Sequence, residues 1–131
     1  MSAALPSLRH VYTGVLILES LKVGVELTEV PLVVRKISRY DVSSATAEQA
    51  SVWSVLDFEV DDDQAEALAE MLSGALDQPG WYADFHNLEE IFVVFPGRVF
   101  RYARGDAAAR AEAQAFGRGL AIPEVQLDWT E

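Results

Sequence analysis

Hydrophobic and polar residues alternate along "SVWSVLDFEV", residues 51–60. Leu56 and Phe58 fall on one face of an extended chain, and Asp57 and Glu59 fall on the other, which predicts a half-buried strand. The next residues, "DDDQAEALAEMLSGAL", carry apolar side chains at helical spacing and predict a helix that ends before "DQPG". Asp61 is the expected N-cap of this helix.

The stretch "GWYADFHNLEEIFVVFPGRVFRY", residues 80–102, combines a short alternating segment with a longer apolar one. In the first segment, Trp81, Ala83 and Phe85 point one way and Tyr82, Asp84 and His86 point the other. "HNLEE" is a turn into "EIFVVF", a strand apolar enough to be buried on both faces. "PG" then turns the chain into "RVFRY", which predicts a third strand.

The rest of the chain completes the predicted architecture. "RHVYTGVLIL" and "VPLVVRKI" are expected strands, "DAAARAEAQAFGRG" is a helix that begins at Asp106, and "PEVQLDW" is a short last strand. The pattern predicts one α+β domain over residues 1–131, in the order β-β-β-α-β-β-β-α-β. We expect a mostly antiparallel sheet of about six to seven strands, with two helices packed on one face. A crossover through the first helix would add one parallel pair.

Composition and charge narrow the classes of function. The chain has 131 residues and a net charge of −11. It has no cysteine, which excludes thiol chemistry, disulfides and thiolate metal centres. No Lys or Arg occurs between Asp41 and Glu90, a segment rich in acids. We therefore expect no nucleic-acid partner. The N-terminus lacks the pattern of a signal peptide and the aliphatic runs are short, so we expect a cytoplasmic protein with no membrane contact.

Three stretches, "GWYADFH", "VVFPGRVFRY" and "GLAIPEVQLDW", resemble a family of small uncharacterised bacterial proteins. The resemblance covers roughly the C-terminal half of the chain. It implies a compact bacterial domain, and it brings no activity, cofactor or catalytic residue with it.

The candidate chemistry centres on Asp84 and His86, which lie two residues apart on one predicted strand face. Such a pair can offer a carboxylate and an imidazole to one metal ion or to one substrate proton. Glu89 or Glu90 could return across the turn to the same face, and His10 or Asp128 could supply a third metal ligand. The alternative is a surface pair at a strand end. With two histidines in the chain, we expect no metal and no cofactor.

The aromatic and basic residues suggest an interface instead. Trp53 and Tyr82 on the polar sheet face would form an amphipathic patch, and Arg98 and Arg101 lie among aromatic residues. The chain has no G-x-S-x-G sequence and no phosphate-binding loop.

Two hypotheses follow. The first is a non-enzymatic acidic interaction module that forms a homodimer through an open sheet face or an edge strand. The second is a small metal-dependent or acid–base enzyme, or a ligand-binding protein, that uses Asp84 and His86, with Glu90 as a third polar group and Tyr82 as a positioning contact. A cleft that gathers these residues around a carboxyl group of raised pKa would favour the second, and a flat apolar patch ringed by charge would favour the first.

Overall fold

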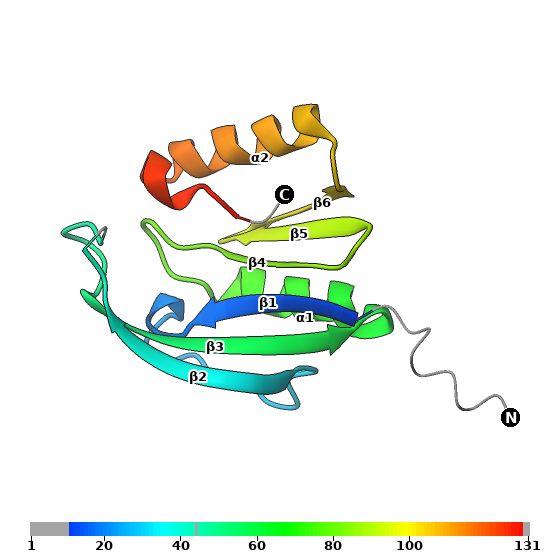
Figure 1. Cartoon of the computed structure of the whole chain (residues 1–131). Coiled ribbons are helices and arrows are strands. Elements are labelled where there is room, and N and C mark those ends of the chain that lie inside the picture. Colours follow the sequence, from blue (N-terminus) through cyan, green and yellow to red (C-terminus); the bar gives the residue numbers. More distant parts are fainter. Residues whose placement is uncertain (1–10, 44, 130–131) are drawn as a thin grey trace, which may run out of the picture.

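The computed structural model describes residues 11–43 and 45–129, which form an α+β domain (Figure 1). It confirms the predicted fold class, with six strands in one sheet. The elements in chain order are β1 (Val11–Ile17), the 3₁₀ helix η2 (Leu18–Ser20), β2 (Val33–Asp41), β3 (Val52–Asp61), α1 (Asp62–Ala75), β4 (Ala83–His86), β5 (Glu90–Phe95), β6 (Arg98–Ala103), α2 (Ala107–Gly119) and the 3₁₀ helix η3 (Glu124–Gln126).

The strands follow the order β2-β3-β1-β4-β5-β6, and every neighbouring pair is antiparallel. The parallel pair that a crossover through the first helix would have added does not form among the described strands. The chain crosses from β3 through α1 to β4, but β1 lies between these two strands and hydrogen-bonds to both. A strand inserted in this way turns a parallel crossover into two antiparallel pairs.

The two helices lie on opposite faces of the sheet, so the prediction that both pack on one face is wrong. On one face of β5, Phe92 and Val94 belong to the apolar cluster of α1. On the other face, Ile91, Val93 and Phe95 belong to the cluster that includes Ala113 of α2. Because β5 is apolar at nearly every position, it needs cover on both sides.

The predicted last strand does not form. Residues 124–126 are a 3₁₀ turn, and the chain then runs beside α2 without joining the sheet. Leu127 and Trp129 are buried in the α2 cluster. Their backbone carbonyls accept hydrogen bonds from Gln114 and Arg110. The alternating apolar residues Leu127 and Trp129 are buried against α2. Side chains of α2, and not the backbone of a neighbouring strand, donate hydrogen bonds to the carbonyl groups of this segment.

The α1 face holds the larger core. Phe85 stacks on Phe92 with ring centroids 4.8 Å apart, and Leu68 and Leu72 of α1 are fully buried against this cluster. The alternation predicted for β4 is confirmed here, because Ala83 and Phe85 point to α1. None of the helices over the described residues has the length and apolar character needed to cross a membrane.

The α2 face is covered over only part of the sheet. Helix α2 packs at the β6 end, away from β2 and β3 (Figure 1). Successive side chains of β1 point to opposite faces of the sheet. Tyr12 and Leu16 are buried on the α1 face, so Val15 points away from α1, and it is 38% exposed. We call the α2-side surface of β1, β2 and β3 the open half-face. Asp84 and His86 lie on β4, at the edge of the open half-face. They pair with Val15 and Thr13 of the neighbouring strand β1, respectively.

Candidate functional site

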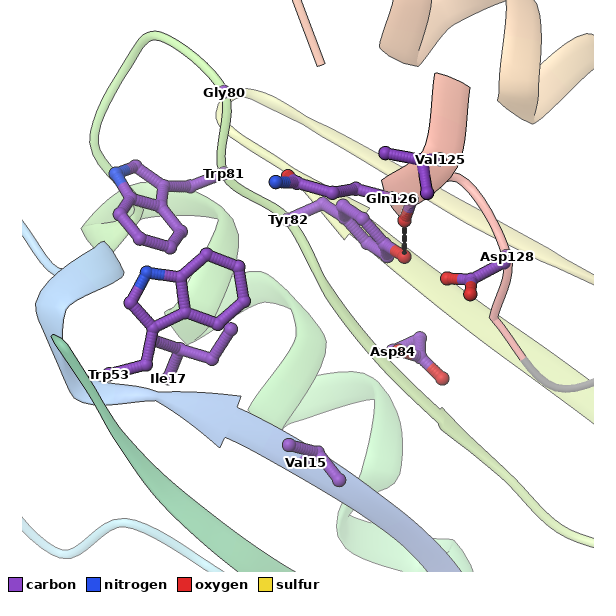
Figure 2. A pocket seen from close by; sticks show the side chains of 10 residues that line it. All are labelled: Val15, Ile17, Trp53, Gly80, Trp81, Tyr82, Asp84, Val125, Gln126 and Asp128. Atoms are coloured by element: carbon purple, nitrogen blue, oxygen red, sulfur yellow. Dashed lines mark hydrogen bonds between the residues drawn. The ribbon is translucent and has the colours of Figure 1, made fainter. Parts of the chain in front are cut away.

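A cavity of about 240 Å³ lies where the open half-face meets the C-terminal segment (Figure 2). Its walls carry three aromatic rings, from Trp53, Trp81 and Tyr82, and two carboxylates, from Asp84 and Asp128. Figure 2 shows the two tryptophans at one end and the two carboxylates at the other, with Val15 and Ile17 of β1 beside them. We call this cavity the aromatic–carboxylate pocket.

Segments far apart in the sequence hold the walls of this pocket together. The Gln49 side chain donates to the Gly80 carbonyl at 2.7 Å and exchanges hydrogen bonds with the Gln126 side chain at 3.0 and 3.1 Å. The Tyr82 hydroxyl donates to the Gln126 carbonyl. These bonds join the chain before β3, the chain before β4 and η3. The pocket is therefore formed in the free protein.

Asp84 is the electrostatically unusual group of the site. The pKa of its carboxyl group is raised to about 7, chiefly by burial and then by the negative charge of Asp128, while Arg110 opposes both effects. The structure records no hydrogen bond to this carboxylate from any other described residue. Burial, together with the charges of Asp84 and Asp128, also raises the pKa of Tyr82. The Asp84 carboxyl group can therefore bind or release a proton near neutral pH.

His86 lines an adjoining pocket of about 320 Å³ that shares Val15 and Asp84 with the first. Its Nδ1 atom is buried and has no hydrogen-bond partner among the described residues. Burial lowers the pKa of the imidazole, and the charge of Arg104 lowers it further. His86 is therefore a neutral group near pH 7, and no carboxylate of the described chain orients its ring.

Glu90 does not join this site. It lies on the α1 face of β5, where its carboxylate accepts from the Tyr12 hydroxyl at 2.7 Å and from the Arg101 guanidinium at 2.9 and 3.0 Å. The hydrogen bond from Tyr12 is the main reason that its pKa is lowered. The expectation that Glu90 returns to the face of Asp84 and His86 is therefore wrong.

The four predicted interface residues separate into different surfaces. Trp53 and Tyr82 both line the aromatic–carboxylate pocket. Arg98 lies over the ring of Phe100, 4.3 Å from its centroid, on the α2 face. Arg101 lies on the α1 face, where it pairs with Glu90. The two arginines do not form one patch with the aromatic pair.

The candidate metal ligands are brought together only in part. Asp128 is close enough to Asp84 for their charges to interact, whereas His10 lies outside the described residues. Over residues 11–43 and 45–129, no three His, Asp or Glu side chains gather in a group that could hold a metal ion.

Sequence reasoning missed one wall of the pocket. Trp81 was expected to point the same way as Ala83 and Phe85, but β4 begins only at Ala83. The Trp81 ring instead lies 5.3 Å from the Trp53 ring and lines the pocket. An aromatic residue directly after Pro79 and Gly80 was the available signal, because strand alternation need not extend into a turn.

No protein-family model matches the chain, and no curated protein or solved structure matches it. The resemblance of its three stretches to uncharacterised bacterial proteins stays a prediction.

Proposed function

We propose that the protein is a non-enzymatic interaction module that binds a basic protein partner on its open half-face. The observation that carries this proposal is the aromatic–carboxylate pocket at the border of that surface. Aromatic side chains with polar tips, such as Trp53 and Tyr82, are typical of interface centres. The exposed side chains of Val15 and Tyr40, 38% and 50% exposed, extend the surface over β1 and β2.

The charge of the site supports a basic partner. Two carboxylates and no cationic side chain line the aromatic–carboxylate pocket. On the neighbouring strands, Arg35 is paired with Glu59 at 2.8 Å. The net charge of −11 would draw a positively charged partner toward the molecule and speed its association.

Acid–base catalysis receives less support. Asp84 has a raised pKa and lines two pockets, as expected for a catalytic carboxyl group, but the other candidate residues do not gather around it. Glu90 is bound to Tyr12 and Arg101 on the other face. The imidazole of His86 lacks an orienting carboxylate among the described residues. A general base needs a positioned partner or substrate within hydrogen-bond reach.

Val15→Lys is expected to weaken the binding of basic peptides about tenfold. Val15 pairs directly with Asp84 across β1 and β4, so a lysine there puts a positive charge beside the pocket. The measurement is selection of a random peptide library displayed on phage against the wild-type protein, followed by affinities of the enriched peptides. We expect peptides of positive net charge, bound about tenfold more weakly by the variant, because like charges across an interface oppose binding.

Val23→Lys is the matched control, because Val23 is fully exposed on the loop after η2 and the change in net charge is the same. It should bind the selected peptides nearly as well as the wild type does. Enrichment of neutral or acidic peptides would contradict the proposal. An equal loss of peptide affinity in Val15→Lys and Val23→Lys would contradict it as well.

We propose that a second copy pairs with β2. This nine-residue strand lies at an edge of the sheet, and Ile37 in its middle is 68% exposed. Exposed edge strands with apolar side chains favour pairing with another chain. Sedimentation velocity should show a dimer for the wild type and a monomer for Ile37→Lys. Leu88→Lys, which changes a 90% exposed residue of the β4–β5 turn, should stay dimeric. A wild type that is monomeric at every concentration would refute this part.

A further inference from the structure

We propose that the aromatic–carboxylate pocket binds the side chain of one arginine residue of the partner, with its guanidinium between Asp84 and Asp128. This assignment rests on the proposed function and gives its binding surface a specific anchor. The chemical class of the ligand is an alkylguanidinium group on a peptide.

The size and lining of the pocket fit one long cationic side chain. Its volume of about 240 Å³ is below the range of about 300–1,000 Å³ found for ordinary small-molecule sites. The carboxylates lie at one end, and the apolar side chains of Val15 and Ile17 line the pocket along β1, with Ile17 beside Trp53 (Figure 2). A methylene stem can pack on such apolar groups while the charged head contacts the carboxylates.

The polar groups of the pocket discriminate among ligands. The Tyr82 hydroxyl is engaged by the Gln126 carbonyl, and the side-chain amide of Gln126 is engaged by Gln49. Among residues 11–43 and 45–129 no recorded hydrogen bond occupies the carboxylates of Asp84 and Asp128, which are the acceptors for the ligand. A guanidinium donates several N–H groups in a planar fork and can bind both, whereas an ammonium is a point charge that is more strongly hydrated. We therefore expect arginine to bind more tightly than lysine.

The charges around Asp84 make this binding dependent on pH. Asp128 and Arg110 act on the carboxyl group from the C-terminal segment and α2. Tyr82, just before β4, and His86, on β4, each line a pocket together with Asp84. Across β1, the adjoining pocket brings the charged side chains of Asp57, Glu59 and Arg35 to the same border. Because the pKa of Asp84 is about 7 and that of His86 is lowered, Asp84 is the main group expected to change charge between about pH 6 and pH 8.

The test is a titration of the whole chain with N-acetyl-arginine amide, followed by NMR. The indole N–H signals of Trp53 and Trp81 should move, while that of Trp129, which is bonded to the Tyr102 hydroxyl outside the pocket, serves as an internal control. Asp128→Asn should weaken binding about tenfold, as expected for the loss of a charge-assisted hydrogen bond. From about pH 6 to pH 8 the affinity should rise about tenfold as Asp84 ionises, and Asp84→Asn should remove this rise. The citrulline and lysine analogues should bind more weakly.

The outcomes separate this inference from the proposed function. If the arginine analogue does not bind while basic peptides still bind in a Val15-dependent way, the anchor is wrong and the interaction module stands. If the analogue binds but no basic peptide does, the pocket is an arginine site and the interaction module is wrong. Tighter binding of free arginine than of the blocked analogue would overturn the assignment to a protein side chain. Equal binding of the citrulline analogue would overturn the role of the carboxylates.

Discussion

Asp84→Asn is expected to raise the free energy of unfolding by about 2–3 kcal/mol at pH 8. The pKa of this carboxyl group rises from 3.8 to about 7 on folding, and each unit corresponds to about 1.4 kcal/mol, so the ionised group costs about 4 kcal/mol. An asparagine removes the charge but still leaves a partly buried amide, which costs about 1–2 kcal/mol. The difference between these two costs is the expected gain.

The direction of the pH dependence follows from the same shift. The unfolded chain releases the Asp84 proton near its ordinary pKa of 3.8, whereas the folded chain holds it up to about 7. Raising the pH between these values therefore favours the unfolded state, and the full cost is present above about pH 7. Near pH 4 the Asp84 carboxyl group is protonated in the folded chain and costs little, so Asp84→Asn should there lower the free energy of unfolding by about 1 kcal/mol instead of raising it.

Urea unfolding at both pH values measures this effect. Asp57→Asn is the matched control, because the change in charge is identical. Asp57 lies on β3 and pairs with Val15 from the side opposite to Asp84. It should alter stability by no more than about 0.5 kcal/mol. An Asp84→Asn variant that is less stable than the wild type at pH 8 would show that the carboxylate is well solvated or paired in the native state.

A carboxylate that lowers stability is informative about function. Proteins often keep destabilising groups where a ligand needs them, and substitutions there raise stability while they reduce activity. If Asp84→Asn stabilises the protein and also removes the pH dependence of arginine binding, one group accounts for both observations. Asp84 would then be kept for binding.

The sequence was sufficient for the local part of the candidate site. Strand alternation correctly assigned Ala83 and Phe85 to the core and Asp84 and His86 to the opposite face. This inference works because successive side chains of a strand point to opposite sides wherever the strand falls in the sheet. It needs no knowledge of the partners.

The position of Glu90 could not be predicted, because it depends on the register of a hairpin. His86 pairs with Ile91, so Glu90 falls on the other face. The Asn87 side chain fixes the turn by accepting from the backbone N–H groups of Glu89 and Glu90 at 2.8 and 2.7 Å. A shift of one residue in the register would reverse the faces of the strand.

The pocket itself was beyond sequence reasoning, because its walls come from four separate segments. Trp53, Trp81 and Asp128 meet only because β1 lies between β3 and β4 and because the C-terminal segment runs back across the sheet. Alternation predicted a last strand for that segment, and side-chain hydrogen bonds from α2 gave it another place. Local patterns cannot distinguish these outcomes, because both bury the same residues.

Gly14→Ala is expected to destabilise the protein by about 3 kcal/mol, because strands β1 and β4 approach closely at this residue. A Cβ atom at Gly14 would lie 2.5 Å from the Asp84 carbonyl oxygen and 2.5 Å from the Phe85 Cβ atom. Both atoms belong to or adjoin the backbone, so the strands must move apart. Overpacking of this kind costs about 1–3 kcal/mol, and the cost is at the upper end where backbone must shift.

Gly74→Ala provides the matched control, since nothing lies within 4 Å of a Cβ atom added there and the residue is within helix α1. Alanine should stabilise that helix by about 0.5–1 kcal/mol. The same urea experiment compares both variants with the wild type. Because Asp84 pairs with Val15, the residue after Gly14, Gly14→Ala should also move the Asp84 carboxylate and weaken binding of the arginine analogue. If Gly14→Ala leaves stability unchanged, β1 and β4 do not approach as closely as described, and the geometry proposed for the pocket fails with them.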